Sequence, residues 1–122
     1  MDEALTVKVR HEQGCAIVTV DGEIDISTVT VLRDCLFEVA SSGAPLVVDL
    51  EQVSFIDSVG LATLVGAAKR AEAHGGSLQV ACALPKISQL VRLTGLDCRI
   101  PLARTLDEAL AFRTGTSTNP PG

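Results

Sequence analysis

The chain has 122 residues, 47% of them hydrophobic, which predicts one compact domain whose core needs neither disulfides nor a structural metal. With a formal net charge of −5, no Trp or Tyr and no basic block, it is poorly equipped to stack on bases or neutralise phosphates, so nucleic acid is not an expected partner. The acidic N-terminus lacks the apolar core of a secretion signal, and no apolar run reaches the roughly 20 residues of a membrane span. We therefore expect a cytoplasmic protein.

The cysteines and histidines suggest no metal or redox site. The four cysteines, Cys15, Cys35, Cys82 and Cys98, are widely spaced and form no C-x-x-C pair, and neither histidine lies in a ligand pattern. We expect reduced thiols that pack as small hydrophobic side chains, with no metal and no cofactor.

The N-terminal segment predicts a β-hairpin. Apolar and polar residues alternate over residues 6–11, a second strand is expected over residues 16–20, and residues 12–14 supply the turn. A loop rich in carboxylates is expected over residues 21–25.

A helix should follow this loop. Ser27 or Thr28 can cap it, and its apolar face consists of Leu32, Cys35, Leu36 and Val39. Residues 41–45, which include Gly and Pro, end this helix.

The middle of the chain predicts a buried strand followed by a helix. Residues 46–50 are apolar except for Asp49, which is typical of a strand covered on both faces. An amphipathic segment runs from Leu61 to Ala73, and glycines at 75 and 76 suit a left-handed helix end. Another strand is expected over residues 77–82.

The C-terminal part should add a helix that begins near Pro85 and ends at Gly95, and then a short strand containing Ile100. Residues 105–108 read Thr-Leu-Asp-Glu, a capping box that should open a last helix reaching about Arg113. The polar residues 114–122 are expected to be a disordered tail.

This order of elements predicts an α/β domain with a mixed sheet of four or five strands and about four helices. In such sheets, working sites collect at loops beyond the carboxyl ends of strands. The loop with Glu23 and Asp25 and the loop of residues 57–60 both follow strands, so we expect them to share one edge of the molecule.

Ser58 stands where a buried strand gives way to a helix. A hydroxyl at a helix N-terminus lies near free backbone N–H groups, which is a suitable place for a phosphate. An isolated Asp57-Ser58 pair before a helix is more often only a cap.

The series of motifs resembles the STAS domain of bacterial anti-sigma factor antagonists. The resemblance covers about residues 5 to 112, and its matching segments are residues 22–25, 46–50, 55–61, 75–78 and 93–96. It implies a single STAS-type domain over residues 1–113.

In that family, the serine that matches Ser58 is phosphorylated by an anti-sigma factor that is an ATP-dependent kinase. The resemblance implies that the unphosphorylated protein binds this anti-sigma factor and frees a sigma factor. Phosphorylation breaks the complex, and a serine phosphatase acting on phospho-Ser58 restores it. The chain has no Walker-type glycine loop, so the ATP belongs on the kinase.

The partner-binding residues expected from these motifs are Glu23, Asp25, Asp57, Ser58, Val59 and Gly60. Gly60 is expected to let the backbone of a partner approach the loop closely. Val59 departs from the family pattern, which commonly has Ser or Thr there, and so removes a second hydroxyl.

Two other functions are weighed against this switch. The domain could be an unmodified scaffold subunit of a stress-signalling or lipid-transport complex, with which Val59 is compatible. An enzyme using Ser58 as a nucleophile is not expected, because neither histidine lies in a triad context. Glu23 and Asp25 could form an acid/base pair, but no nucleophile or metal ligand accompanies them.

Overall fold

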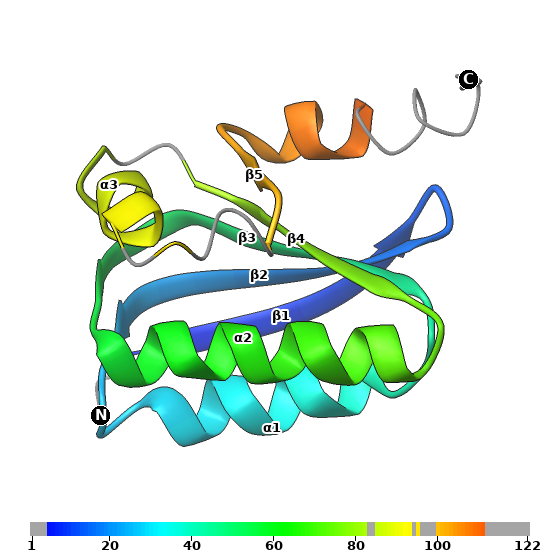
Figure 1. Cartoon of the computed structure of the whole chain (residues 1–122), viewed down its shortest axis with the longest axis horizontal. Helices are drawn as coiled ribbons and strands as arrows, with labels where there is room; N and C mark the ends of the chain where they lie inside the picture. Colours follow the sequence, from blue (N-terminus) through cyan, green and yellow to red (C-terminus); the bar gives the residue numbers. More distant parts are fainter. Residues whose placement is uncertain (1–4, 83–84, 94, 96–99, 112–122) are drawn as a thin grey trace.

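The computed structural model describes residues 5–82, 85–93, 95 and 100–111. Its elements are, in chain order, β1 (Leu5–Glu12), β2 (Cys15–Ile24), α1 (Val29–Ala40), β3 (Pro45–Ile56), α2 (Ser58–Ala73), β4 (Ser77–Ala81), α3 (Pro85–Leu93) and β5 (Leu102–Ala103). Residues 106–111 form a further short helix, called the terminal helix below. One five-stranded sheet has the order β1-β2-β3-β4-β5, with β1 antiparallel to β2 and all other neighbours parallel (Figure 1). The expected mixed α/β sheet is confirmed.

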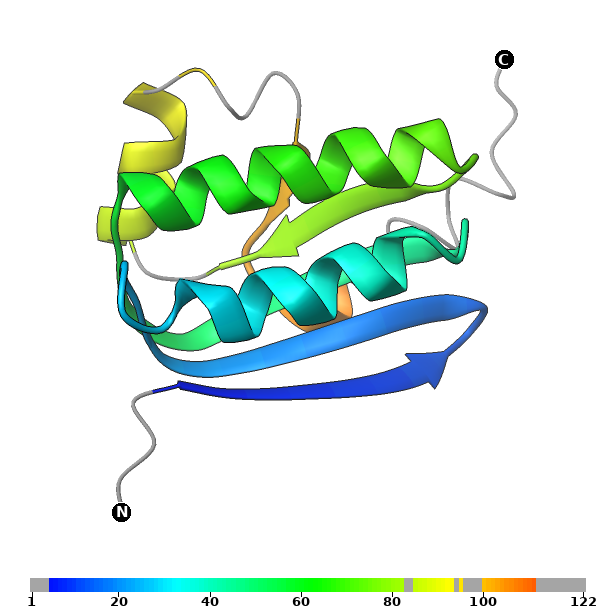
Figure 2. The same cartoon turned by 90° about the horizontal axis from the view of Figure 1, so that it is seen from below.

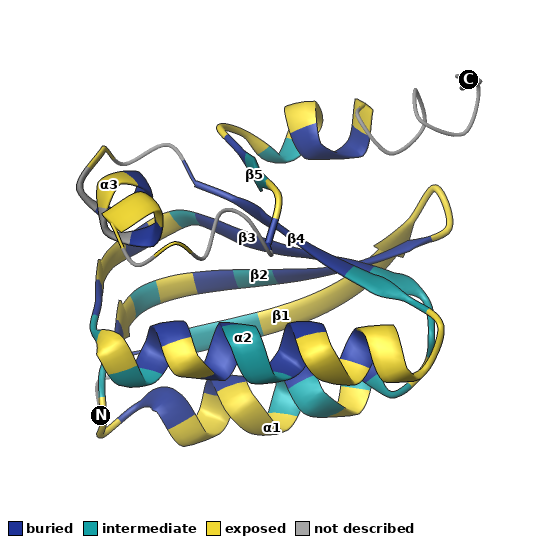
Figure 3. Cartoon of the chain, in the orientation of Figure 1, coloured by how far each residue is buried: buried dark blue, intermediate teal, exposed yellow. Residues whose placement is uncertain are grey.

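The sheet separates two layers of helices. Helices α1 and α2 lie side by side under one face, and the terminal helix lies over the other (Figures 1 and 2). The main core fills the space between the sheet and α1 and α2, and a smaller cluster lies beneath the terminal helix (Figure 3). The smaller cluster consists of Cys15, Ile17, Val47, Ala81, Ala103, Ala109 and Leu110.

Strand β3 is covered on both faces, as its apolar run predicts. Leu46, Val48 and Leu50 belong to the main core, while Val47 points to the smaller cluster. Residues three and four apart on α1 and α2 supply the other side of the main core, because those spacings place side chains on one face of a helix.

Two strands are longer than expected. Residues 21–24 continue β2, and β3 runs on to Ile56, because Glu23 pairs with Phe55 and Ile24 with Ile56. The register of this pairing shifts beside Gly22, whose φ of 124° is in the region that favours glycine. This irregularity breaks the period of two, so the sequence pattern alone indicated a loop.

The C-terminal elements also differ in detail from the expectation. Ile100 is buried but precedes the last strand, which is Leu102–Ala103. In the capping box, Thr105 Oγ1 accepts a hydrogen bond from the Glu108 N–H (3.0 Å), whereas Glu108 Oε1 accepts from the N–H of Arg104 (2.7 Å). Arg113 and the tail of residues 114–122 lie outside the described residues.

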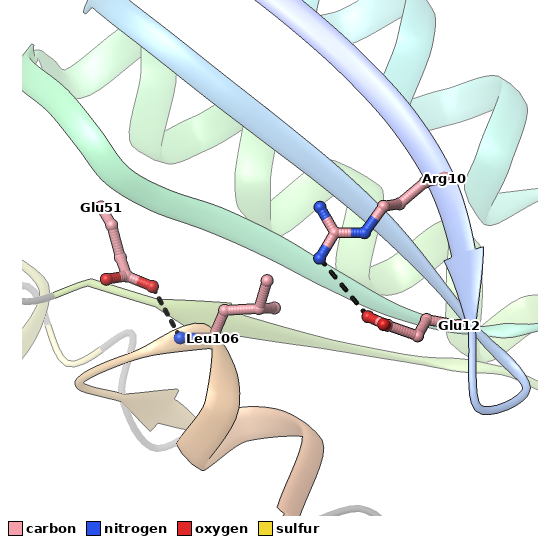
Figure 4. Close-up of polar contacts among 4 residues, drawn as sticks. All are labelled: Arg10, Glu12, Glu51 and Leu106. Atoms are coloured by element: carbon pink, nitrogen blue, oxygen red, sulfur yellow. Dashed lines mark hydrogen bonds and ion pairs between the residues drawn. The ribbon is translucent and has the colours of Figure 1, made fainter.

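The sheet also holds the terminal helix through Glu51 of β3. Glu51 Oε2 accepts a hydrogen bond of 2.7 Å from the backbone N–H of Leu106, one of the N–H groups that a helix leaves without an internal acceptor (Figure 4). On the same face, Arg10 and Glu12 of β1 form an exposed ion pair at 3.4 Å (Figure 4). Exposed pairs of this kind contribute little to stability.

Asp49 gives the fold a predictable dependence on pH. It is buried, its Oδ1 accepts from the Glu51 N–H (3.0 Å), and burial raises the pKa of its carboxyl. Because the folded state then holds the proton more tightly than the unfolded state, stability falls as the pH rises from the ordinary aspartate pKa through the raised one. Asp49→Asn keeps an acceptor oxygen without the charge.

We expect Asp49→Asn to raise the free energy of unfolding at about pH 7, and this gain should disappear as the pH falls through the raised pKa of Asp49 to about pH 4. Urea unfolding at several pH values measures this difference. An equal gain at every pH would mean that the carboxylate charge is not its source.

Within the described residues, no helix is both long enough and apolar enough to cross a membrane.

Candidate functional site

Parallel pairing of β2 with β3 brings the two predicted loops together. Glu23 lies beside Phe55 and Ile24 beside Ile56, so residues 25–28 and the start of α2 leave the sheet at the same edge. The N–H of Asp57 donates to the carbonyl oxygen of Ile24 (3.2 Å), which ties the loops together. The expected shared edge is confirmed.

Asp57 caps α2. Its backbone is extended (φ −107°, ψ −173°), and its side-chain Oδ1 accepts a hydrogen bond from the Gly60 N–H at 3.1 Å. Ser58 is the first residue of α2 and is exposed, and its hydroxyl has no hydrogen-bond partner among the described residues. A free hydroxyl therefore lies at the positive end of a 16-residue helix.

We expect Asp57→Ala to lower the free energy of unfolding by about 1 kcal/mol, because the Gly60 N–H loses its acceptor at the helix start. Asp57→Asn keeps a capping oxygen and is the matched control, with a smaller expected loss. Urea unfolding of the two variants checks this. Equal losses would show that charge, rather than the capping bond, accounts for the effect.

Asp25 organises the neighbouring loop. Its Oδ1 accepts hydrogen bonds from the Ser27 hydroxyl (2.7 Å), the Ser27 N–H (3.0 Å) and the Thr28 N–H (3.1 Å). The Ser27 hydroxyl is the main cause that lowers the pKa of Asp25, and the backbone N–H groups add to it. Asp25 is therefore ionised at neutral pH and already engaged within its own loop.

The expected cap of α1 by a hydroxyl is not formed. Thr28 occupies the N-cap position, but its side chain makes no capping hydrogen bond. Its hydroxyl donates instead to the carbonyl oxygen of Glu23, at 2.8 Å. The Val31 N–H, which a capping hydroxyl of Thr28 would accept, donates instead to the Thr28 carbonyl oxygen at 3.1 Å, because the Thr28 backbone is already helical rather than extended.

Gly60 is buried, so it does not serve the close approach of a partner's backbone that the sequence led us to expect. A Cβ at Gly60 would lie 2.6 Å from both Ile24 Cγ2 and Ile56 Cγ1, closer than real atoms come. The close approach that requires glycine is therefore between α2 and its own sheet, not between the loop and the backbone of a partner.

The other expected binding residues are divided between surface and core. Glu23 is exposed, whereas Val59 is half-buried and packs against the main core. The Val59 carbonyl oxygen also accepts a hydrogen bond from the Thr63 hydroxyl (2.9 Å).

Two exposed apolar side chains at this edge were missed. Ile26, next to Asp25, is 75% exposed, and Phe55, beside Glu23, is 48% exposed. Large apolar groups left in solvent near a site often mark an interaction surface. The available sequence signal was the polar setting of Ile26, which lies in a turn between Asp25 and Ser27 and has no periodic apolar neighbours.

Comparison with known proteins supplies the family. Residues 6–109 match the family model of the STAS domain. The chain belongs to the STAS domain family. The anti-sigma-B factor antagonist of Bacillus subtilis is 36% identical to it over 92 residues, which cover 75% of this chain and 84% of that protein. That relative is named for a regulatory role rather than for a catalytic activity.

Solved structures agree with this assignment. An anti-sigma factor antagonist from Mycobacterium paratuberculosis superposes with a TM-score of 0.81 at 36% identity, over 88% of this STAS chain and 92% of that chain. The Bacillus cell fate determinant SpoIIAA in its phosphorylated form has a TM-score of 0.68 at 22% identity, over 88% of this chain and 99% of that one. The second match shows a shared fold.

Proposed function

We propose that this protein is a cytoplasmic anti-sigma factor antagonist controlled by phosphorylation of Ser58. The unphosphorylated form binds an anti-sigma factor that is also an ATP-dependent serine kinase, and a sigma factor is thereby released. A serine phosphatase that acts on phospho-Ser58 resets the cycle. The observation that carries the proposal is the exposed Ser58 hydroxyl at the start of α2.

The surroundings of Ser58 support a switch that acts at an interface. Because its hydroxyl makes no hydrogen bond to the described residues, adding a phosphate removes no internal contact seen there. The phosphate adds about −1.5 to −2 charges, which the N-terminus of α2 partly accommodates. The fold can therefore remain the same while the surface changes.

A bound partner would meet a different surface after phosphorylation. Asp57 at the helix start and exposed Glu23 on the adjoining strand already make this edge acidic, and Ile26 and Phe55 give it an apolar component. A partner that covers these groups would have to desolvate a dianion beside carboxylates. A loss of about 3 kcal/mol weakens binding more than 100-fold, which is enough to exchange partners.

The first test is to map phosphorylation on the protein purified from its own host, by intact mass and peptide sequencing. Phosphate on Ser58 supports the proposal. Phosphate on a different residue contradicts the assignment of the switch to Ser58. A pull-down with Ser58→Ala then identifies the kinase, because this variant is expected to bind it without accepting phosphate.

A second measurement distinguishes the scaffold function from the phosphorylation switch. Val59, whose apolar side chain packs against the main core, is compatible with the scaffold function. Size-exclusion chromatography of native extract separates the two functions. A stable large complex, with Ser58 unmodified under several growth conditions, favours the scaffold, whereas a small species that exchanges between complexes favours the switch.

A further inference from the structure

Strand β1 forms an open edge of the sheet. In the order β1-β2-β3-β4-β5 it has a neighbour on one side, and within the described residues no strand pairs with its outer side. An edge strand presents backbone N–H and C=O groups outward, where a strand of another chain can pair with them. Because β1 is eight residues long, has no proline and pairs with β2 without a shift in register, a further strand could pair along its length.

The side chains of β1 alternate between the two faces of the sheet. Val9 lies opposite Val18 of the main core, so it is on the face that α1 covers, and it is 42% exposed. Arg10 lies opposite Ile17 of the smaller cluster, so it is on the face of the terminal helix. Lys8, two residues earlier, is exposed on the same face as Arg10. The edge is therefore apolar on one face and carries two cations on the other.

Helix α1 continues the apolar side of this edge, because it lies between α2 and β1 (Figure 2). Phe37 Cζ lies close to Gly66 of α2, so Phe37 marks the side of α1 that faces α2. Val31, Cys35 and Val39 are four residues apart and lie on the opposite side of the helix, toward β1. Val31 is 53% exposed, and the other two are half-buried. With two valines of β1 they form what we call the apolar margin, which consists of Val7, Val9, Val31, Cys35 and Val39.

The charges of β1 disfavour a second copy of this chain as the occupant. Two copies could pair antiparallel with their sheet faces aligned. A register centred on Lys8 or on Val9 brings valines together, but it sets Lys8 opposite Lys8 or Arg10 of the other copy. A register centred on Arg10 sets the two copies of Arg10 opposite each other and Val9 opposite His11. Like charges directly opposite each other destabilise a strand pair, so the edge suits a partner that brings acidic side chains.

We propose that β1 and the apolar margin bind an extended segment of another protein in which apolar residues alternate with Asp or Glu. The segment pairs with the outer side of β1 as a sixth strand. Its acidic side chains lie beside Lys8 and Arg10, and its apolar side chains lie against the apolar margin. Lys8 has no ion-pair partner among the described residues, and the Arg10–Glu12 pair is exposed and weak enough to rearrange. The surface does not include Ser58, so this binding does not require the proposed switch.

The probe is a blocked peptide as long as β1 in which Glu and Val alternate. Its matched control has the same composition in the repeated order Glu-Glu-Val-Val. Both are titrated into the isotope-labelled full-length protein, and amide chemical shifts are followed by NMR. We expect saturable shifts in β1 and residues 31–39, with the alternating peptide binding about tenfold more tightly, because a period of two places every Glu on one face of a strand. A peptide that alternates Lys and Val should not bind.

The variant Lys8→Glu tests the charge of the edge, and the exposed side chain can be replaced without disturbing the core. It should bind the Glu–Val peptide about fivefold more weakly than wild type and should gain affinity for the Lys–Val peptide. Lys69→Glu makes the same change of charge at an exposed position of α2 and should leave both affinities unchanged. Val31→Ser should weaken binding of the Glu–Val peptide about threefold, because it removes part of the apolar margin. The comparison of peptides on wild-type protein needs no variant.

Several outcomes overturn the proposal. One is the absence of saturable shifts up to about 1 mM peptide, and another is equal affinity of wild type for the alternating peptide and its control. Shifts centred on residues 55–60 would place the peptide at the edge that carries Ser58. Unchanged affinities of Lys8→Glu would contradict recognition by charge. Dimerisation of wild type without peptide, seen by sedimentation and accompanied by slower hydrogen exchange in β1, would assign the edge to a second copy.

Discussion

Replacing Ser58 with aspartate is expected to weaken binding to the anti-sigma factor by about 100-fold, equivalent to about 2.7 kcal/mol. The new carboxylate would stand beside Asp57 at the start of α2, on the surface that we propose the partner covers. Its charge would be desolvated in the complex without a matched cation. Isothermal titration calorimetry without ATP measures the affinity while preventing phosphorylation of wild type.

Two variants control for this result. Ser58→Ala should bind nearly as tightly as wild type, because the hydroxyl makes no hydrogen bond to the described residues. Ser42→Asp adds the same charge at an exposed position beyond the other end of α1 and should leave the affinity unchanged. Wild-type affinity for Ser58→Asp would show that charge at this position does not control the complex.

Replacing Gly60 with alanine is expected to lower the free energy of unfolding by about 2 kcal/mol, because overpacking a core displaces side chains or backbone. The added Cβ would lie 2.6 Å from side-chain carbons of Ile24 and Ile56, both buried between sheet and helices. To relieve the contact, the first turn of α2 must move away from the ends of β2 and β3. Urea unfolding measures the loss.

Gly66→Ala is the matched control in the same helix. Its Cβ would lie 3.1 Å from Phe37 Cζ, the end of a half-buried side chain that can shift. Alanine is favoured over glycine in a helix by up to about 1 kcal/mol, so Gly66→Ala should be neutral or stabilising. If Gly60→Ala behaved in the same way, the tight packing of α2 on the two isoleucines would not hold.

The same displacement connects Gly60 to the proposed switch. Gly60 supplies the N–H that Asp57 accepts, and Ser58 lies between them. A shift of this turn would move the hydroxyl relative to Glu23 and Phe55 on the neighbouring strands. We therefore expect Gly60→Ala to reduce partner binding as well as stability, although Gly60 itself is buried.

Local patterns were sufficient for part of this protein. The apolar run at residues 46–50 predicted a strand covered on both faces, and the step from that region to an Asp-Ser pair and an amphipathic segment predicted a capped helix with Ser58 at its start. These features depend on residues close together in the chain: alternation, helical spacing and a short side chain that reaches a nearby N–H. The motifs in their order also identified the STAS family, which the family match confirms.

Only the tertiary structure revealed the features that depend on contacts between strands remote in sequence. The pairing of Glu23 with Phe55 lengthened both strands and turned an expected loop into a sheet edge. The burial of Gly60 likewise follows from neighbours distant in sequence. The physical reason is that strand register and core packing result from many weak contacts between segments that are remote in sequence. A bulge at a single glycine can also shift the register of two strands, and the local alternation of apolar and polar residues does not reveal such a shift.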